Sequence, residues 1–422
     1  MIYRWGFIYF FLGLFFYTNQ GHAQVNALSL SEALQRTAQF NLSLAQYPFH
    51  QQQQQALRAQ ANIKPPPRIK LSAENMLGTG DMQDFNDAEM TLMLGQLIEL
   101  GDKSTARIAL AAASEQKMQA EYEVLRLDIF AETSKRFYQA LKLQALADLS
   151  LKRIQQEQHA LSLLQTQAKA GAVSDREVAK MALHLAQAKM HQTELTDEQA
   201  QVRLRLSRLW QARPDFTHVK GELLQLPQLP KESVLLSQLD KSPAVFLQQA
   251  LVRLAKSQWK VESSLSRADL NLSAGVKYRP HSTDTGFNVM LEIPLHFNSP
   301  NSGRVEAAES AQRLSYQQQA DNYQQLVLHI LEIHQQTLAL QRQIKRIKAS
   351  LLPEAKSLLA ATEKALAKGQ ASVMQWVDAE DELDALERSL IEKHWLIYMN
   401  LLEIERITGL SIVAATSPRR LQ

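Results

Sequence analysis

The sequence predicts a mainly α-helical protein that has a small β part and contains two internal repeats. Its 422 residues include only 14 Gly and 13 Pro, and Ala, Leu, Gln, Glu and Lys are abundant, which is typical of long helices. A Gly-x-x-Ser turn at 171–174 recurs at 369–372, about 200 residues later. Four short segments alternate apolar and polar residues, as strands with two different faces do.

The two turns belong to a larger duplication. Segment 69–78, IKLSAENMLG, resembles segment 270–279, LNLSAGVKYR, at nearly the same offset. A period of this length that occurs only twice is too long for a solenoid repeat. We therefore predict five parts, which are a signal peptide at 1–23, a first repeat at 24–212, a linker at 213–229 with one short strand, a second repeat at 230–412 and a C-terminal tail at 413–422.

The first residues have the pattern of an export signal. Arg4 precedes an apolar run at 5–17, and Gly21 and Ala23 occupy the small-residue positions of a cleavage site. The alternative is a membrane anchor, but the run is shorter than the ~20 residues of a spanning helix. We expect an exported chain that begins at Gln24.

Each repeat is expected to have the same order of elements. A short helix (44–62 and 243–265) is followed by two strands, a long helix (102–168 and 302–368), the turn, and a second helix (174–212 and 372–410). At 1.5 Å per residue the longest helices would reach roughly 100 Å, and Pro353 is expected to bend one of them. Apolar residues spaced by seven predict coiled-coil packing between these helices, and they are Trp376, Leu383, Leu390, Ile397 and Ile404.

The two turns are predicted to be the tips of helical hairpins. A glycine in the left-handed conformation can end each long helix, and a serine can cap the next one. Glu177 and Gln375 would complete a capping box with Ser174 and Ser372. The predicted tip residues are Gly171, Ala172, Val173, Ser174, Gly369, Gln370, Ala371 and Ser372.

The strand segments have one apolar and one polar face, which is the pattern of a membrane strand. The apolar positions of the second pair are Leu270, Leu272, Val276, Tyr278, Phe287, Val289, Leu291 and Ile293. The alternative is a two-faced sheet in water. Strands in lipid must close into a barrel, and four cannot close alone. Two chains would supply eight strands and three would supply twelve, which leaves more room for an aqueous lumen, and we infer a trimer.

Composition excludes several classes of function. The chain has no Cys, and its net charge of +3 gives no basis for nucleic-acid binding. The 11 His residues do not form an HExxH motif, and no phosphate-binding loop or GxSxG motif is present. We therefore predict no cofactor, no metal site and no enzymatic activity.

With these features the chain resembles the TolC-like outer membrane efflux proteins. The resemblance covers nearly all of the mature chain, and it rests on the duplicated element order, the Gly-x-x-Ser tips, PPP at 65–67 and VDA at 377–379. LIELGDK at 97–103 and IPLHFNSPNSG at 293–303 resemble the branch that serves cobalt–zinc–cadmium type cation exporters.

The resemblance implies a homotrimeric channel. Its 12-stranded β-barrel would lie in outer membrane lipid, and long antiparallel helices would form an α-barrel in the periplasm. The helical tips would dock onto a periplasmic adaptor protein bound to an inner-membrane RND-type pump. The implied cargo is divalent heavy-metal cations. A duct for drugs or small organic compounds, and a periplasmic coiled-coil scaffold that never enters lipid, are the alternatives.

Family members often narrow the tunnel with acidic residues near the tips. The Asp-x-x-Asp motif after the second tip is matched here by Gln375 and Asp378, and an Asp near the first tip is matched by Asp175. We predict these three residues as the pore constriction. The Arg and Tyr that tie the first-tip Asp in the best-known member are replaced by Ala371 and Leu366, so closure is expected to depend on packing or on the adaptor.

Overall fold

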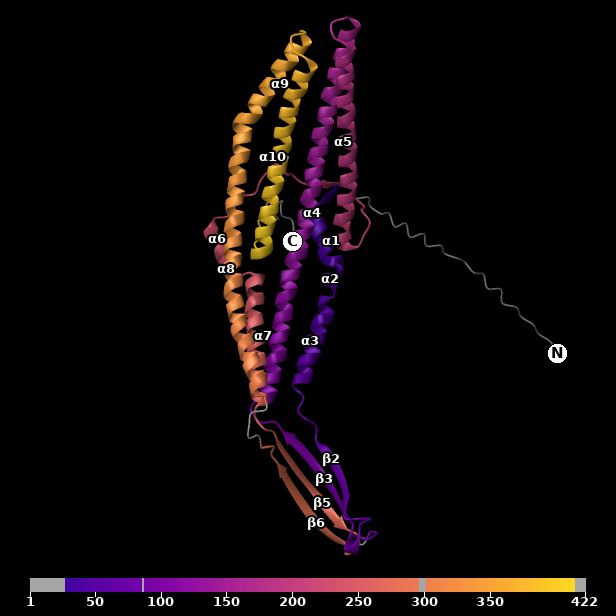
Figure 1. Cartoon of the computed structure of the whole chain (residues 1–422), viewed down its shortest axis with the longest axis vertical. Helices are drawn as coiled ribbons and strands as arrows, with labels where there is room; N and C mark the ends of the chain where they lie inside the picture. Colours follow the sequence, from indigo (N-terminus) through magenta and orange to yellow (C-terminus); the bar gives the residue numbers. More distant parts are fainter. Residues whose placement is uncertain (1–26, 86, 296–300, 414–422) are drawn as a thin grey trace, which may run out of the picture.

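The computed structural model describes residues 27–85, 87–295 and 301–413. The predicted signal peptide and residues 414–422 of the predicted tail lie outside this part of the chain. The described residues form a long rod of helices with a four-stranded sheet at one end and two helical hairpin tips at the other (Figure 1).

Both halves of the chain have the predicted order of elements. The first half contains β1 (Ala27–Ser29), α1 (Leu30–Phe40), α2 (Leu42–Ala45), α3 (Tyr47–Ala61), β2 (Arg68–Glu74), the 3₁₀ turn η1 (Gly80–Met82), β3 (Glu89–Ile98), α4 (Lys103–Lys169), α5 (Asp175–Ser207) and the 3₁₀ turn η2 (Arg208–Trp210). The linker contains β4 (His218–Lys220). The second half contains α6 (Glu232–Leu239), α7 (Pro243–Leu265), β5 (Leu270–Arg279), β6 (Asp284–Glu292), α8 (Ser302–Arg346), the π-helical turn η3 (Ile347–Leu351), α9 (Leu352–Ala367) and α10 (Val373–Thr408). The long helices begin and end within a few residues of their predicted limits.

The sequence patterns missed three short elements, which are β1, α1 and α6. Helix α1 begins at a capping box, in which Ser29 and Glu32 exchange hydrogen bonds, and helix α6 follows the linker. The predicted linker strand is present as β4, and it pairs in parallel with β1, so that the buried Leu28 and Val219 face each other. This pairing joins the start of the described chain to the segment between the two halves.

Side-by-side packing of long helices builds the core. Helix α4 contacts α5, α7 and α10, and α10 also contacts α8 and α9. The predicted seven-residue stripe is buried in α10 at Trp376, Leu390, Ile397 and Ile404, whereas Leu383 is half-buried. The predicted coiled-coil contact between the helices is therefore confirmed.

The second long helix changes direction where α8 is followed by α9 (Figure 1). Pro353 lies just after the π-helical turn, and its ring nitrogen cannot donate the hydrogen bond that would continue the helix. A π-turn accommodates such a break by widening one turn of the helix. The bend that Pro353 predicted therefore has a local structural cause.

The sheet has the strand order β2-β3-β5-β6, and every pair is antiparallel. Strands β3 and β5 approach each other closely at Gly275, where a Cβ atom would clash with the carbonyl of Leu92 and with Met93. Glycine is needed there because of this approach.

Candidate functional site

One face of the sheet is apolar across all four strands. The register places Ile69 opposite Leu94, Leu94 opposite Ala274, and Ala274 opposite Val289. The large apolar side chains on this face are exposed, and they are Ile69, Leu71, Met90, Leu92, Leu94, Leu272, Val276, Tyr278, Phe287, Val289 and Leu291. Phe287 is 86% exposed and Val289 is 76% exposed. A continuous exposed apolar face of this kind indicates a contact with lipid or with another protein.

The eight predicted membrane-strand residues have similar environments. Six of them lie in β5 or β6 and are exposed on the apolar face. Leu270 is half-buried at the start of β5, and Ile293 is exposed just after β6 ends. The predicted alternation is confirmed, while the contact of this face with lipid stays a prediction.

The opposite face of the sheet is mainly polar, although Met93 and Met290 also lie on it. Glu89 is buried there and forms ion pairs with Lys277 and Arg279 of the neighbouring strand. Thr91 and Ser273 of the same face are also buried. This face therefore carries a charged and hydrogen-bonding surface beneath the apolar one.

The sheet has two unpaired edges among the described residues. Strands β2 and β6 stand at the two ends of the strand order, and each pairs with one neighbour. Because the order alternates in direction, β2 and β6 run antiparallel to each other. The free edges can therefore continue the same antiparallel ladder when copies of the sheet are placed edge to edge.

At the other end of the rod, the two glycines adopt the predicted conformation. Gly171 has φ +74° and Gly369 has φ +71°, and no neighbouring atom crowds either residue. Ala172, Ser174, Gln370 and Ser372 are exposed, like both glycines, whereas Val173 and Ala371 are half-buried. The tips are therefore accessible in this chain.

The predicted capping boxes differ between the two tips. Ser372 accepts a hydrogen bond from the backbone N–H of Gln375 at 3.2 Å, and Gln375 Oε1 accepts from the backbone N–H of Ser372 at 2.8 Å. The predicted box at Ser174 and Glu177 is wrong, because the Ser174 side chain accepts no capping hydrogen bond. The first hairpin instead starts α5 with two acidic residues, Asp175 and Glu177, which stabilise a helix N-terminus electrostatically.

The three predicted constriction residues are exposed. Gln375 and Asp378 lie about one turn apart on the exposed face of α10, and Asp175 begins α5 at the other tip. A single chain does not define a pore, so the lumen-facing role of these residues stays a prediction.

An apolar cluster joins the two hairpins near their tips. It contains side chains from α4, α5, α9 and α10, namely Ala160, Leu164, Met181, Leu359, Leu366, Val373, Trp376, Val377 and Ala379. Leu366 is buried in this cluster and the half-buried Ala371 packs against it. Packing therefore occupies the positions where the family resemblance had pointed to a polar lock.

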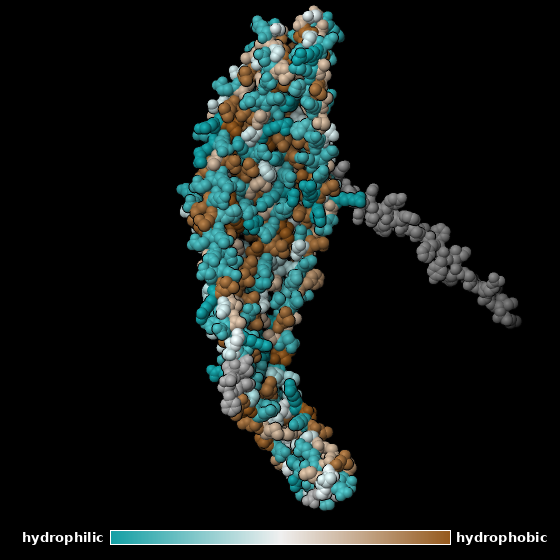
Figure 2. Space-filling model, in the orientation of Figure 1, coloured by the Kyte–Doolittle hydropathy of each residue, from teal (hydrophilic) through white to brown (hydrophobic). Residues whose placement is uncertain are grey.

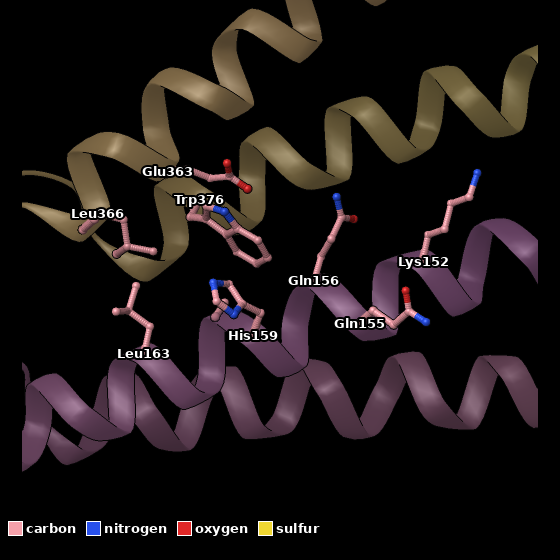
Figure 3. Close-up of a pocket in the computed structure, with 10 residues that line it drawn as sticks. Lys152, Gln155, Gln156, His159, Leu163, Glu363, Leu366 and Trp376 are labelled. Carbon is pink, nitrogen blue, oxygen red and sulfur yellow. The ribbon is translucent and has the colours of Figure 1, made fainter.

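A groove runs beside this cluster, between α4 and the α9–α10 hairpin (Figure 3). His159 and Leu163 of α4 face Leu366 and Trp376 across it, and Glu363 lies above the indole (Figure 3). The groove encloses about 570 Å³ and is also lined by the polar side chains of Lys152, Gln155 and Gln156. The two hairpins are thus in contact along their cores but separated at this face.

The sequence patterns did not single out a charged network that lies between α4 and α10 near the groove. Arg153 of α4 is surrounded by carboxylates from α4 and α10, which include the buried Glu157 and Glu380. A signal for it is present in the sequence, because Glu380 occupies the second seam of the seven-residue pattern, four residues after Trp376. Glu380 is buried, and a charged residue at such a position has to find a partner.

No group of three or more His, Asp and Glu side chains in residues 27–85, 87–295 and 301–413 could hold a metal ion. No helix in the same residues is both long and apolar enough to cross a membrane.

Comparison with known proteins links this geometry to one family. The profile of the outer membrane efflux protein family matches residues 31–211 and 235–410. The chain is 24% identical over 383 residues, which is 90% of both chains, to the cobalt-zinc-cadmium resistance protein CzcC of Cupriavidus metallidurans.

Solved structures have the same fold. The outer membrane protein VceC of Vibrio cholerae superposes with a TM-score of 0.73 at 16% identity, over 90% of this chain and 96% of that chain. CusC, whose structures concern transmembrane channel formation, superposes with a TM-score of 0.75 at 12% identity, over 92% of this chain and 94% of that chain. The rod with its terminal sheet is therefore the fold of these proteins.

The difference between the tips leads to a paired prediction. Ser372→Ala should destabilise the start of α10 by about 1 kcal/mol, because it removes a capping acceptor, and Ser174→Ala should have almost no effect. Hydrogen exchange of the backbone amides in the first turn of α10 and of α5 measures both effects. Equal changes at the two tips would contradict the assignment of the cap to Ser372 alone.

Proposed function

The chain belongs to the outer membrane efflux protein family, and on this basis we propose that it is the passive outer membrane duct of a tripartite exporter. An inner-membrane RND-type pump would supply the energy, and a periplasmic adaptor would join the pump to the duct. The observation that carries the proposal is the sheet, because its apolar face is exposed over four strands and both of its edges are free.

Closure of the sheet leads to a homotrimer. Backbone groups in lipid need hydrogen-bond partners, so the free edges of β2 and β6 must be paired. Three chains placed edge to edge give a barrel of twelve strands, with the apolar face against outer membrane lipid and the Glu89 face lining water. Eight strands from two chains would leave an interior filled by side chains, which does not suit a duct.

The helical rod would continue the duct in the periplasm. Three copies of α4, α5, α8, α9 and α10 would surround a tunnel, and the six exposed tips would form its inner end. We propose that residues 171–174 and 369–372 dock onto the adaptor, and that Asp378, Gln375 and Asp175 line the narrowest part of the tunnel. The proposed boundaries remain a signal peptide at 1–23 and two repeats at 24–212 and 230–412.

The proposed cargo is divalent heavy-metal cations. Support for this comes from the similarity to CzcC, which is named for cobalt, zinc and cadmium resistance. A passive tube need not bind what passes through it, so cargo is set by the pump. A duct for drugs or small organic compounds is the second candidate.

The membrane assignment predicts that two adjacent positions of β6 respond differently to charge. Val289→Lys places an ammonium on the apolar face and should cost about 2–4 kcal/mol if that face meets the bilayer midplane. Asn288→Lys places the same group on the polar face and should be tolerated. The fraction of chain recovered in the outer membrane as a detergent-resistant trimer measures both. Equal assembly of the two variants, or recovery of the wild-type chain in the soluble periplasm, would favour the scaffold alternative.

The cargo assignment is tested in cells. Deletion of the gene should raise the cellular content of cobalt, zinc or cadmium and leave the accumulation of a fluorescent efflux dye unchanged, because the pump would lose its outlet for cations only. Wild-type chain should restore the metal content, and the Val289→Lys variant should not. Dye accumulation without metal accumulation would instead support the duct for organic compounds.

The constriction is tested by conductance. Asp378→Asn should lower the preference of the channel for cations over anions in a planar bilayer, because three carboxylates around a narrow lumen attract cations. Glu354→Gln, which neutralises an exposed carboxylate in the first turn of α9, is the matched control and should leave selectivity unchanged. Unchanged selectivity in Asp378→Asn would place this side chain outside the pore.

A further inference from the structure

The two hairpins are joined behind the tip cluster by a network around Arg153 of α4. Its guanidinium lies 2.9 Å from Glu157 Oε1, 2.7 Å from Asp381 Oδ1, 3.3 Å from Glu380 Oε2 and 3.6 Å from Asp384 Oδ2. Glu157 belongs to α4, and the other three carboxylates belong to α10. The contact therefore ties the α4–α5 hairpin to the α9–α10 hairpin through charge.

The network contains more negative than positive charge. Four carboxylates face Arg153, and Arg388, which binds Asp384, supplies the second guanidinium. Glu157 is 1% exposed and Glu380 is 3% exposed, so water screens their charges poorly. Fully ionised, these six groups would carry a net charge of −2, and of the four carboxylates only Asp381 is exposed to water.

Three carboxylate oxygens in this network lack a hydrogen-bond donor among the described residues. They are Glu157 Oε2, Glu380 Oε2 and Asp384 Oδ1, and each is shielded from solvent. Glu380 Oε2 is close to Arg153 Nε, but the geometry is not that of a hydrogen bond. A buried acceptor without a donor costs free energy, and protonation of one carboxylate removes a charge and supplies a donor at the same time.

Other charged groups lie near this junction but form no ion pair with Glu380. His191 of α5 contacts Arg388 at 3.0 Å through Nε2 and Glu194 at 3.2 Å through Nδ1. Lys152 and His159 of α4 and Glu363 of α9 line the groove beside Trp376, which precedes Glu380 by one turn. Neither Arg388 nor any of the other side chains named here is an ion-pair partner of Glu380, so Arg153 is its nearest cation.

From this geometry we propose that Glu380 binds a proton at the junction of the two hairpins, and that release of the proton loosens their contact. The junction would be tight when Glu380 is neutral and weaker when it is ionised. The proposal concerns the contact between two hairpins of one chain. It therefore holds or fails independently of the cargo, of the adaptor and of the trimer.

The pKa of Glu380 determines whether a rise in pH favours the joined or the separated hairpins. Burial, opposed by Arg153 and supported by Glu157, Asp384 and Asp381, raises this pKa from 4.5 to about 7. Separation of the hairpins would return the carboxyl to water and to its ordinary value. Between these two pH values the joined state holds one more proton than the separated state, so the ratio of separated to joined hairpins should rise by up to about tenfold per pH unit. Below pH 4.5 Glu380 is protonated in both the joined and the separated state, and above about pH 7 it is ionised in both. Outside these limits the ratio of separated to joined hairpins no longer changes with pH.

The chain has no Cys, so a pair of introduced cysteines can be labelled without background. Spin labels at Ala172→Cys and Gln370→Cys, both exposed at the tips, report the distance between hairpins by pulsed electron paramagnetic resonance. Full-length labelled chain is mixed with an excess of unlabelled chain, so that only distances within one copy are seen. The wild-type distance distribution should lengthen and broaden between about pH 5 and pH 8.

Glu380→Gln mimics the protonated side chain and should keep the short, narrow distribution at every pH. Glu382→Gln, at an exposed position of the same helix, is the matched control and should respond to pH like wild type. A wild-type distribution that does not change with pH would overturn the proposal, and so would a Glu380→Gln variant that still responds.

A second measurement does not depend on the stability of the variant. The infrared carbonyl band of a protonated buried carboxyl should be present in wild-type protein at acidic pH and disappear as pH passes through about 7. The Glu382→Gln control should show the same band. A band that is lost entirely near the ordinary value of a glutamate would overturn the proposal.

Discussion

The lateral contact between α4 and α10 is the interaction on which the rest of the structure depends. Helix α4 has 67 residues and α10 has 36, and helices of such length are stable in water only when an apolar stripe is covered. Apolar side chains of the two helices pack together in two clusters, one near the middle of the rod and one near the tips. The relative position of the two tips follows from this contact, whereas the sheet end is held by the packing of α4 against α3 and α7 and of α7 against α8.

The space-filling view shows the consequence at the surface. Polar side chains dominate the helical rod, and apolar side chains gather in patches along it and at the sheet end (Figure 2). On α10 most of the large apolar residues are buried within the chain, whereas on the sheet they are exposed. One polypeptide therefore combines a helical core that is packed within the chain with a sheet whose apolar face is uncovered.

The sequence was sufficient to predict the features that depend on local patterns. The seven-residue spacing predicted the long helices, and the alternation at Leu270–Arg279 predicted a strand. Gly171 and Gly369 predicted the two tips. The short strand β1 was missed because it is three residues long and pairs with a segment almost two hundred residues away. The capping box at Ser174 was predicted wrongly because a matching spacing does not fix the rotamer of a serine.

The candidate site was predictable only in part, for a related reason. Exposure of Gln375 and Asp378 follows from their spacing on α10, but whether they face a lumen depends on other copies of the chain. The network at Arg153 depends on which turn of α4 meets which turn of α10, and periodicity does not determine that register. The one available signal, an acidic residue in a buried seam, is visible at Glu380 once both seams of the helix are written out.

The unpaired edges of strands β2 and β6 also constrain how the chain can fold. Its helices bury their own stripes and satisfy their own backbone groups, so they can form in water as soon as one copy is made. The sheet has two unpaired edges and an exposed apolar face, and both favour aggregation until other copies of the chain cover them. In the proposed trimer, maturation should therefore proceed from helices to strands, and the slow step should be the association of copies at the membrane and not the folding of any one copy.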